Sequence, residues 1–356
     1  MDFALSDEQQ MIAETARAFF AENATSERTR AAMSATGADA GIDRALWQAF
    51  CTELGLSGVG IAEQAGGAGL GLVELALVAE AAGAQVAALP MLGSLVRCAQ
   101  AIAAGGTDAQ KAELVPALLS GETIAGYVLD PALKVEGNVL TGSDRFVSHG
   151  AAAQVFVVTD GKGMWVVRGN APGVSVAAQT TMDQTRPLAH VTLDGVAGES
   201  LADAAAALDR AHAAGFVALA AEALGGAQAC LDRTVAYSRE RVQFGRPIGS
   251  FQAYKHRLAD MMIEIEQARS AVWWAACAVD EGSDEAGLAI HAAKAFCADT
   301  FHMCAGNMIQ LHGGIGFTWE HDAHLYFKRA RAILSAMGDG TWHRERIAAQ
   351  ILGDAA

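Results

Sequence analysis

Residues 239–252 read RERVQFGRPIGSFQ, and this stretch decides how the C-terminal half of the chain is interpreted. Apolar residues recur at helical spacing before it, over Ala204–Arg241, and after it, over Phe251–Glu281. The stretch therefore joins two long predicted helices and gathers three hydrogen-bonding side chains around the turn: Arg241, Arg246 and Gln252. A guanidinium group at such a turn offers a fork of donors that suits phosphate oxygens. An ordinary helical hairpin with solvated charges is the alternative for this stretch taken alone.

A second stretch, residues 310–317, reads QLHGGIGF and ends another predicted helix, Asp284–Leu311. The adjacent glycines Gly313 and Gly314 allow a ligand to approach the backbone closely. The amide of Gln310 can both donate and accept a hydrogen bond. Taken alone, the two glycines are more typical of a helix C-cap followed by a turn. The two stretches become informative when they are considered together.

The residues upstream of these helices fall into two segments with different sequence patterns, one helical and one typical of strands. The first 120 residues have helical spacing, and Ser6 with Gln9 forms a capping box at the first helix. Further helices are predicted at Arg44–Leu54, Leu72–Ala82, Gly93–Ala103 and Asp108–Leu119. From Glu122 to Gly195, short β-branched runs alternate with turn signals, which predicts a small antiparallel β domain.

The order of these segments defines the predicted fold class, which is α+β and mostly α. We expect an N-terminal helical domain over 1–120, a β domain over 121–197, and a C-terminal four-helix bundle over 198–356. The bundle includes a last predicted helix over Asp322–Ser335. Strands and helices do not alternate as βαβ units, which argues against a doubly wound nucleotide-binding fold.

Composition excludes several classes of partner. The chain has 356 residues and a formal net charge of −15, so it lacks the basic surface that nucleic acid requires. Its most apolar stretches, Gly71–Leu92 and Ala211–Leu231, are interrupted by glutamates and indicate buried helices rather than membrane spans. The six cysteines form no CxxC pair. We expect buried free thiols and a cytoplasmic location.

Other motifs give weaker signals. Glu320, His321 and His324 could suggest a metal site, but the start of a surface helix explains them better, and no metal is predicted. The glycines at positions 67, 69 and 71 lack the preceding strand of a dinucleotide fingerprint. Neither a Gly-x-Ser-x-Gly elbow nor an HExxH sequence occurs.

Together, in this order, the two C-terminal stretches resemble the acyl-CoA dehydrogenase family. That family carries an Arg-x-x-Phe-Gly turn, a Phe-Gln or His-Gln pair, and then Gln-x-x-Gly-Gly-x-Gly-Phe. The likeness extends to the N-terminal half, through Leu46-Trp47, Gly66-Gly67 and the sequence that begins at Gly106-Thr107. The chain is accordingly similar to subunits of heteromeric acyl-CoA dehydrogenases, which are short forms of the family.

The resemblance implies an oligomeric FAD enzyme that forms an α,β-double bond in an acyl-CoA thioester. Electrons would leave through an acceptor like electron-transfer flavoprotein. Four residues would meet the ADP portion of FAD, as they do in the family across a subunit interface: Arg241, Gln243, Phe244 and Gln252. The neighbouring subunit would complete that cleft with Gln310, Gly313 and Gly314. Further cofactor contacts are implied beside the flavin ring and after the catalytic position: Phe146, Ser148, Thr341 and His343.

The position of the family's catalytic base departs from the usual pattern. Most members have a glutamate before Gly-Thr near the C-terminus, whereas this chain has Asp339 in the sequence MGDGT, residues 337–341. Aspartate is a competent base but is shorter by roughly 1.5 Å. A family relative that oxidises nitroalkanes does use aspartate there. The alternative is that Asp339 only caps the final helix. The position that carries the base in some other members is Gly215, which cannot supply one.

A loop in the β domain is also shortened. The family's glycine-rich loop, which wraps the flavin and the acyl chain, is reduced to Leu129-Asp130-Pro131-Ala132. The sequence therefore leaves two hypotheses open. In the first, Asp339 is the proton acceptor of an active dehydrogenase. In the second, the chain is a non-catalytic partner that completes the FAD cleft of a heterotetramer with a paralogous subunit. The acyl substrate cannot be read from the sequence.

Overall fold

The computed structural model describes residues 5–353, and contacts divide them into two compact units. The first unit comprises the chain up to Ser26, Ala76–Ala87, and the chain from Phe216 onward. The second comprises Glu27–Leu75 and Ala88–Gly215. The helices α4 (Leu72–Ala84) and α7 (Ala204–Glu240) contribute residues to both units.

The second unit holds short helices and nearly all of the strands. Its helical segments are α2 (Ser26–Ser34), η1 (Gly37–Asp39), α3 (Arg44–Thr52), η2 (Glu63–Ala65), η3 (Leu92–Ala99), α5 (Gln100–Gly105), α6 (Asp108–Leu119) and η4 (Gly150–Ala152). Its strands are β1 (Ala125–Leu129), β2 (Lys134–Glu136), β3 (Val139–Ser148), β4 (Val155–Thr159), β5 (Met164–Arg168), β6 (Val174–Ala178), β7 (Leu188–Ala197) and β8 (Glu199–Ser200). The helix predicted over Gly93–Ala103 is present, but its first part, η3, is a π-helix.

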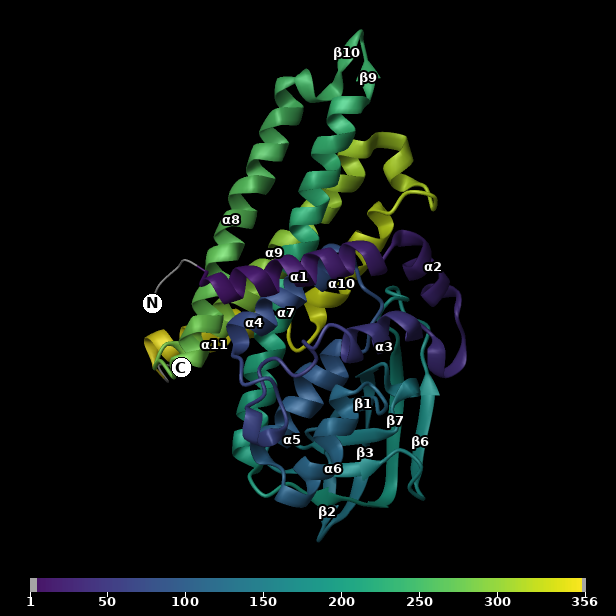
Figure 1. Cartoon of the computed structure of the whole chain (residues 1–356), viewed down its shortest axis with the longest axis vertical. Helices are drawn as coiled ribbons and strands as arrows, with labels where there is room; N and C mark the ends of the chain where they lie inside the picture. Colours follow the sequence, from purple (N-terminus) through teal and green to yellow (C-terminus); the bar gives the residue numbers. More distant parts are fainter. Residues whose placement is uncertain (1–4, 354–356) are drawn as a thin grey trace. The chain divides into compact units, whose positions relative to one another are not determined.

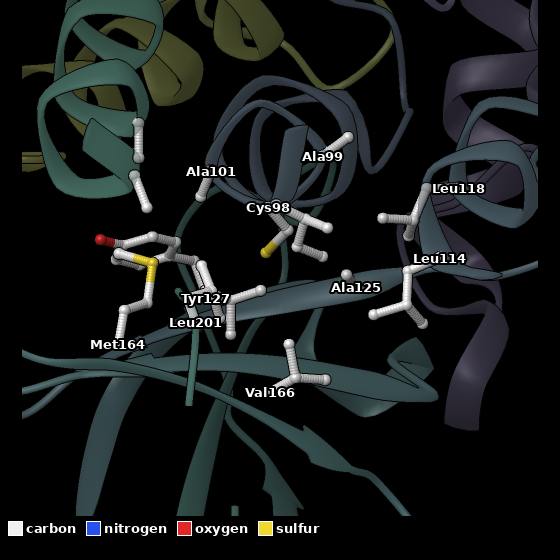
Figure 2. Packing of buried hydrophobic residues seen from close by; sticks show 14 of the residues in the cluster. Cys98, Ala99, Ala101, Leu114, Leu118, Ala125, Tyr127, Met164, Val166 and Leu201 are labelled. Atoms are coloured by element: carbon white, nitrogen blue, oxygen red, sulfur yellow. The ribbon is translucent and has the colours of Figure 1, made fainter. Parts of the chain in front are cut away.

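The strands form two four-stranded sheets, in the orders β1-β4-β5-β8 and β2-β3-β7-β6. All pairs are antiparallel except β1 with β4, which run parallel. Parallel pairing requires a long connection, and the chain makes that connection through β2 and β3 of the other sheet. One apolar cluster packs β1, β4 and β5 against η3, α5, α6 and the start of α7, and Figure 2 shows Cys98, Tyr127, Met164 and Leu201 within it. A second cluster packs the two sheets together.

The first unit is helical. It holds α1 (Asp7–Asn23), most of α4 and of α7, and then α8 (Gln252–Asp280), α9 (Ala286–His312), η6 (Gly313–Phe317), α10 (Ala323–Ser335) and α11 (Gly340–Leu352). Between α7 and α8 lie β9 (Val242–Gln243), β10 (Arg246–Pro247) and η5 (Ile248–Ser250). The capping box predicted at Ser6 is present, since the Ser6 hydroxyl and the Gln9 amide each bond the other residue's backbone N–H. The predicted fold class is confirmed.

The helix α7 is the one described helix that is long and apolar enough to cross a membrane. In the folded chain, 89% of its most apolar window is buried. Alanines and paired glycines fill that window, which suits a helix with neighbours close on several sides. The interpretation of Ala211–Leu231 as a buried helix agrees with this burial.

Two glycines allow α4 and α7 to pack backbone against backbone. A Cβ atom added to Gly225 would lie 1.9 Å from the carbonyl oxygen of Glu80, and one added to Gly83 would lie 2.2 Å from that of Glu222. The same region holds the ion pair between the buried side chains of Arg329 and Glu222. A close helix contact of this kind tolerates no larger residue, because the obstructing atoms belong to the backbone.

We predict opposite effects for two glycine-to-alanine substitutions within helices. Gly225→Ala should lower the free energy of unfolding by about 1–3 kcal/mol, because α4 and α7 must separate. Gly306→Ala, in α9, should raise it by about 0.5–1 kcal/mol, because an added Cβ meets no atom within 4 Å. Urea unfolding followed by circular dichroism measures both values. Equal effects of the two substitutions would contradict the proposed helix contact.

Candidate functional site

The Arg-x-x-Phe-Gly stretch forms a small β-hairpin at the ends of α7 and α8 (Figure 1). Gln243 pairs with Arg246, which leaves Phe244 and Gly245 as a two-residue turn. Their φ angles are +54° and +76°, as a type I′ hairpin turn requires, and glycine at the second position removes one Cβ clash. The Phe244 side chain is 92% exposed. The hairpin therefore projects an aromatic ring into solvent.

The hairpin and its flanking residues, 241–252, are called the hairpin tract. Within it, Arg246 and Phe244 both contact the ring of Phe251. The guanidinium of Arg246 lies 4.0 Å from the centre of the Phe251 ring, and Phe244 meets the same ring edge-on at 6.2 Å. Arg241 and Gln252, at the two ends of the tract, are both exposed. Gln243 is exposed as well and donates its amide to the Val242 carbonyl at 2.8 Å. The predicted cofactor contacts of this tract thus lie on an accessible surface.

The glycine tract, residues 310–317, begins where α9 ends. Gly313 has φ +62° and closes the helix, and η6 follows it. A Cβ atom added to Gly313 or Gly314 would meet nothing within 4 Å, so the backbone is open on that side. Gln310 is exposed, and the Phe317 side chain is 88% exposed. The geometry provides both an unobstructed backbone and apolar surface.

Two contacts within the chain bring the hairpin tract and the glycine tract to the same end of the helical unit. The Tyr254 hydroxyl, at the start of α8, donates to the Leu311 carbonyl at 3.1 Å. Tyr237, near the end of α7, stacks on His312 with ring centres 4.5 Å apart. Each contact joins residues that flank the predicted cofactor contacts. The two tracts are therefore neighbours in the folded chain.

The predicted ring-side residues lie on β3, in the second unit. The Phe146 side chain is 74% exposed, and the Phe146 N–H bonds the Asp144 carboxylate at 2.7 Å where the β3–β7 register shifts. Ser148 is half-buried, and its hydroxyl lies 3.1 Å from Nδ1 of His149. The ring of Phe146 is therefore exposed. The hydroxyl of Ser148 is already in hydrogen-bond contact with the His149 ring.

The shortened loop after β1 is held closed by two carboxylates. Asp130 accepts hydrogen bonds from the Ala132 and Ser143 N–H groups at 2.9 and 2.8 Å. Asp144 accepts one from the Leu129 N–H at 2.9 Å. A longer glycine-rich loop is replaced by a tight connection whose backbone donors are already satisfied. These N–H groups are consequently committed within the chain.

Asp339 is exposed and stands at the N-cap of α11. Its carboxylate accepts a hydrogen bond from the Trp342 N–H at 2.8 Å. The two residues before it have left-handed backbone, with φ +57° at Met337 and +101° at Gly338. A helix N-terminus favours an anion through its free N–H groups and its dipole. The capping role considered for Asp339 is therefore present, and it leaves the side chain accessible.

A buried lysine supports the loop that carries Asp339. Lys294, on α9, is fully buried and donates to the carbonyls of Leu334, at 3.3 Å, and of Gly338. Burial lowers the pKa of the Lys294 ammonium to about 8, although the carboxylates of Asp299 and Asp339 act in the opposite direction. The ammonium thus fixes the end of α10 to the loop and places a positive charge near Asp339. The sequence interpretation missed Lys294, because nothing in the local spacing marks it.

The rings of Phe216, His291 and His343 pack together next to this loop. Phe216 packs on the rings of His291 and His343, with centres 5.1 and 4.9 Å apart. His343 is fully buried, and its Nδ1 lies 2.7 Å from Nδ1 of His291. Thr341, by contrast, is exposed. The side chain next to Gly215 is thus an aromatic packing residue, and the His343 side chain lies in the interior.

Comparisons with known proteins agree with this arrangement. Residues 6–122 match the acyl-CoA dehydrogenase N-terminal domain, and residues 214–352 match the acyl-CoA dehydrogenase C-terminal domain. The acyl-CoA dehydrogenase IpdE2 of Mycobacterium tuberculosis is 37% identical over 328 residues, which cover 91% of each chain. IpdE2 of Mycolicibacterium smegmatis is 33% identical over 98% of this chain and 100% of its own.

The chain belongs to the acyl-CoA dehydrogenase family.

Solved structures give the same result for the fold of this family member. A variant of the Tcur3481–Tcur3483 steroid ACAD superimposes with a TM-score of 0.86 at 32% identity and covers 97% of this chain and 98% of its own. The ChsE4–ChsE5 complex from Mycobacterium tuberculosis gives a TM-score of 0.89 at 29% identity, with 100% of both chains covered. The family resemblance inferred from the two C-terminal stretches is confirmed.

FAD is the cofactor of this family, and the described residues fit it. A dinucleotide needs backbone and side-chain donors for its diphosphate and apolar surface for its rings. The open backbone at Gly313 and Gly314 and the exposed Phe244 ring provide surfaces of both kinds. Among residues 5–353, no group of three or more His, Cys, Asp or Glu side chains is arranged to hold a metal ion.

We predict that the histidine pair makes folding of this chain sensitive to acid. Burial, followed by nearby positive charge, lowers the pKa of His343 to about 3 and that of His291 to about 4. In the unfolded chain, the histidine pKa values are about 6.5. At pH values between the folded and the unfolded pKa values, the unfolded chain therefore binds more protons than the folded chain. Stability should therefore fall as pH decreases below about 6.5.

The measurement is the urea midpoint at about pH 7 and about pH 5. His291→Phe should show a smaller loss between these values than the unchanged chain, because one buried group no longer titrates. His256→Phe, at an exposed position on α8, should show the same loss as the unchanged chain. An unaltered pH dependence in His291→Phe would rule out the buried pair as its source.

Proposed function

We propose that this chain is an FAD-dependent acyl-CoA dehydrogenase that forms an α,β-double bond, with Asp339 as the base that removes the α-proton. One observation carries the proposal: an exposed carboxylate stands at the position of the family's base, on a loop fixed by the buried Lys294. Catalysis by proton abstraction needs such a group within hydrogen-bond reach of the substrate. The family membership supplies the reaction class.

The surroundings of Asp339 hold its carboxylate in a defined position at the start of α11. Its carboxylate bonds the Trp342 N–H, and α11 directs its positive N-terminal end toward it. The Lys294 ammonium lies behind the loop. A fixed loop limits how far the shorter side chain can move, which matters because an error of about 1 Å can cost on the order of 100-fold in rate. Because the aspartate side chain is shorter, the acyl α-carbon must lie closer to the backbone of residue 339 than it would if a glutamate stood there.

The FAD-binding role is assigned to the hairpin tract and the glycine tract. Arg241 would bind the diphosphate, since a guanidinium pairs with two phosphate oxygens at once. The exposed side chains around it would complete the contact with the ADP portion: Gln243, Phe244 and Gln252. Gln310, Gly313 and Gly314 would complete the same cleft in a neighbouring subunit, and Phe146, Ser148 and Thr341 remain the proposed contacts nearer the flavin ring, whereas the buried side chain of His343 is not available for such a contact. Bound FAD supplies the acceptor for the hydride that leaves the β-carbon.

These assignments imply an oligomer, and we place the chain in the cytoplasm. Large apolar side chains are exposed along both tracts and just after the second one, and a monomer would leave them in water: Val242, Phe244, Ile315, Phe317 and Trp319. Relatives include the ChsE4–ChsE5 complex, so either a homo-oligomer or a heterotetramer with a paralogue is a suitable assembly. Electrons would pass to an acceptor like electron-transfer flavoprotein. The six described cysteines are free thiols, as a reducing cytoplasm favours.

A second candidate function is that of a non-catalytic partner that completes the FAD cleft of a heteromeric acyl-CoA dehydrogenase. The tight loop at residues 129–132, whose backbone donors are committed, favours this alternative. The two functions are separated by purifying the chain alone and recording its visible absorbance. A yellow oligomer that acyl-CoA bleaches supports the first. A colourless chain that acquires FAD only on co-expression with a glutamate-bearing paralogue supports the second.

We predict that Asp339→Asn separates the capping role from the catalytic role. Asparagine still caps α11, so the thermal midpoint should stay unchanged, while Asp339→Ala should lose about 1 kcal/mol of stability. Flavin reduction by butanoyl-, hexanoyl- or octanoyl-CoA, followed by stopped-flow absorbance without oxygen, should slow by about 100- to 10,000-fold in Asp339→Asn. Unchanged reduction would exclude Asp339 as the base.

We also predict that Arg241 dominates retention of the cofactor. Arg241→Ala should weaken FAD binding by about 10- to 100-fold, because a charge-assisted contact to phosphate is lost. The matched control is Arg239→Ala, also exposed, two residues earlier on the last turn of α7. FAD content after gel filtration and fluorescence titration of the apoprotein measure the difference. Equal loss in the two variants would indicate a general charge effect instead.

A further inference from the structure

The helix α8 has two faces with apolar side chains, and one of them is buried within the helical unit. The buried face consists of residues at helical spacing: Met261, Ile265, Ala268, Val272, Ala275, Ala276 and Ala278. It contacts α9, where the Cys297 thiol donates to the Ala268 carbonyl at 3.5 Å. In Figure 1, α8 runs along one edge of the helical unit. The packing of this helix inside the unit is thus explained by one face alone.

The other face, called the outer stripe, consists of five exposed residues: Lys255, Ala259, Met262, Ile263 and Glu266. With 3.6 residues per turn, their spacing places them together, turned about 120° around the helix axis from the buried face. Met262 and Ile263 are each 53% exposed. Adjacent large apolar side chains that remain in water, with charged residues around them, are typical of an interaction surface.

The outer stripe carries opposite charges at its two ends. Lys255 lies before the apolar centre, and no carboxylate in residues 5–353 is within ion-pair distance of it. Glu266 lies after the apolar centre, its side chain is 61% exposed, and it meets Arg269 at 3.5 Å. Both charges are therefore accessible to a partner.

A second copy of the same helix in antiparallel orientation matches this order of residues. A two-fold axis makes every contact occur twice, with the same two residues exchanged between the copies. If the axis crosses α8 midway between Lys255 and Glu266, each lysine lies opposite the glutamate of the other copy. The same register places Ala259 opposite Met262, so that a small side chain receives a large one. A parallel arrangement would instead place like charges together.

We propose that the outer stripe is an interface between two copies of this chain, in which two α8 helices pack antiparallel around Met262 and Ile263. This contact is separate from the proposed FAD contacts, since Met262 lies about 15 Å along α8 from Gln252. It requires neither a bound cofactor nor an active base. The contact buries the apolar centre and pairs the charges at both ends of the stripe.

The first test is sedimentation equilibrium of the full chain, purified alone. The unchanged chain should form at least dimers at about 10 μM. Met262→Glu should raise the dissociation constant by about 100-fold or more, because each interface would then bury two unpaired carboxylates. The mean mass should accordingly halve. Met182→Glu is the matched control, since it places the same charge at a methionine that is 60% exposed outside α8, and it should not change the mass.

The second test exchanges the charges and examines the register. Lys255→Glu alone and Glu266→Lys alone should each weaken association by about 3- to 30-fold, because both contacts across the axis would then join like charges. The double variant should associate like the unchanged chain, and so should an equimolar mixture of the two single variants. A parallel arrangement predicts no recovery in the double variant.

The outcomes are separable from those of the proposed function. Circular dichroism should show unchanged helix content in every variant, because the substituted side chains are exposed. If Met262→Glu folds poorly, the charge exchange decides. A chain that binds no FAD but still dimerises through the outer stripe supports the interface while the proposed function fails.

Three results overturn the inference. The first is an unchanged chain that remains monomeric at about 100 μM. The second is a mass that Met262→Glu leaves unaltered, or single charge variants that do not recover on mixing. The third is assembly that appears only on co-expression with a paralogue, because the outer stripe would then bind a different chain.

Discussion

The ammonium of Lys294 is the constraint on which the proposed catalytic end of this chain depends. It is fully buried on α9, so it loses its hydration and must be compensated by the protein. The carbonyls of Leu334 and Gly338 supply that compensation at the negative end of α10. The same two bonds fix the left-handed Met337–Gly338 segment. Asp339 follows directly, so the position of one carboxylate depends on one buried cation.

The hairpin tract and the glycine tract, which carry the proposed FAD contacts, are also fixed by contacts within the helical unit. There the ends of α7, α8 and α9 are tied together through Tyr237 on His312 and Tyr254 on the Leu311 carbonyl. These contacts bury the polar groups next to the two tracts while the tracts themselves stay exposed. A binding surface of this kind is prepared before the ligand arrives, which lowers the entropy lost on binding.

The residues proposed to contact FAD are unequally provided with free donors. The hairpin tract and the glycine tract present exposed side chains and an open backbone. Near β3, the donors of the shortened loop already bond Asp130 and Asp144. An active enzyme must then contact the ring with few backbone groups of its own, whereas a partner subunit could supply them.

The sequence by itself determined the features that depend on neighbours along the chain. Helical spacing and β-branched runs predicted the order of helices and strands, and a turn was expected between the two long helices where the structure has a type I′ hairpin. Capping of the last helix was one of the two roles considered for Asp339. Only the tertiary structure decided which distant residues meet. Lys294 reaches Gly338 across 44 positions, and His291 reaches His343 across 52. Such pairs leave no periodic signal, because contacts between helices are set by packing angles and side-chain volume rather than by sequence spacing.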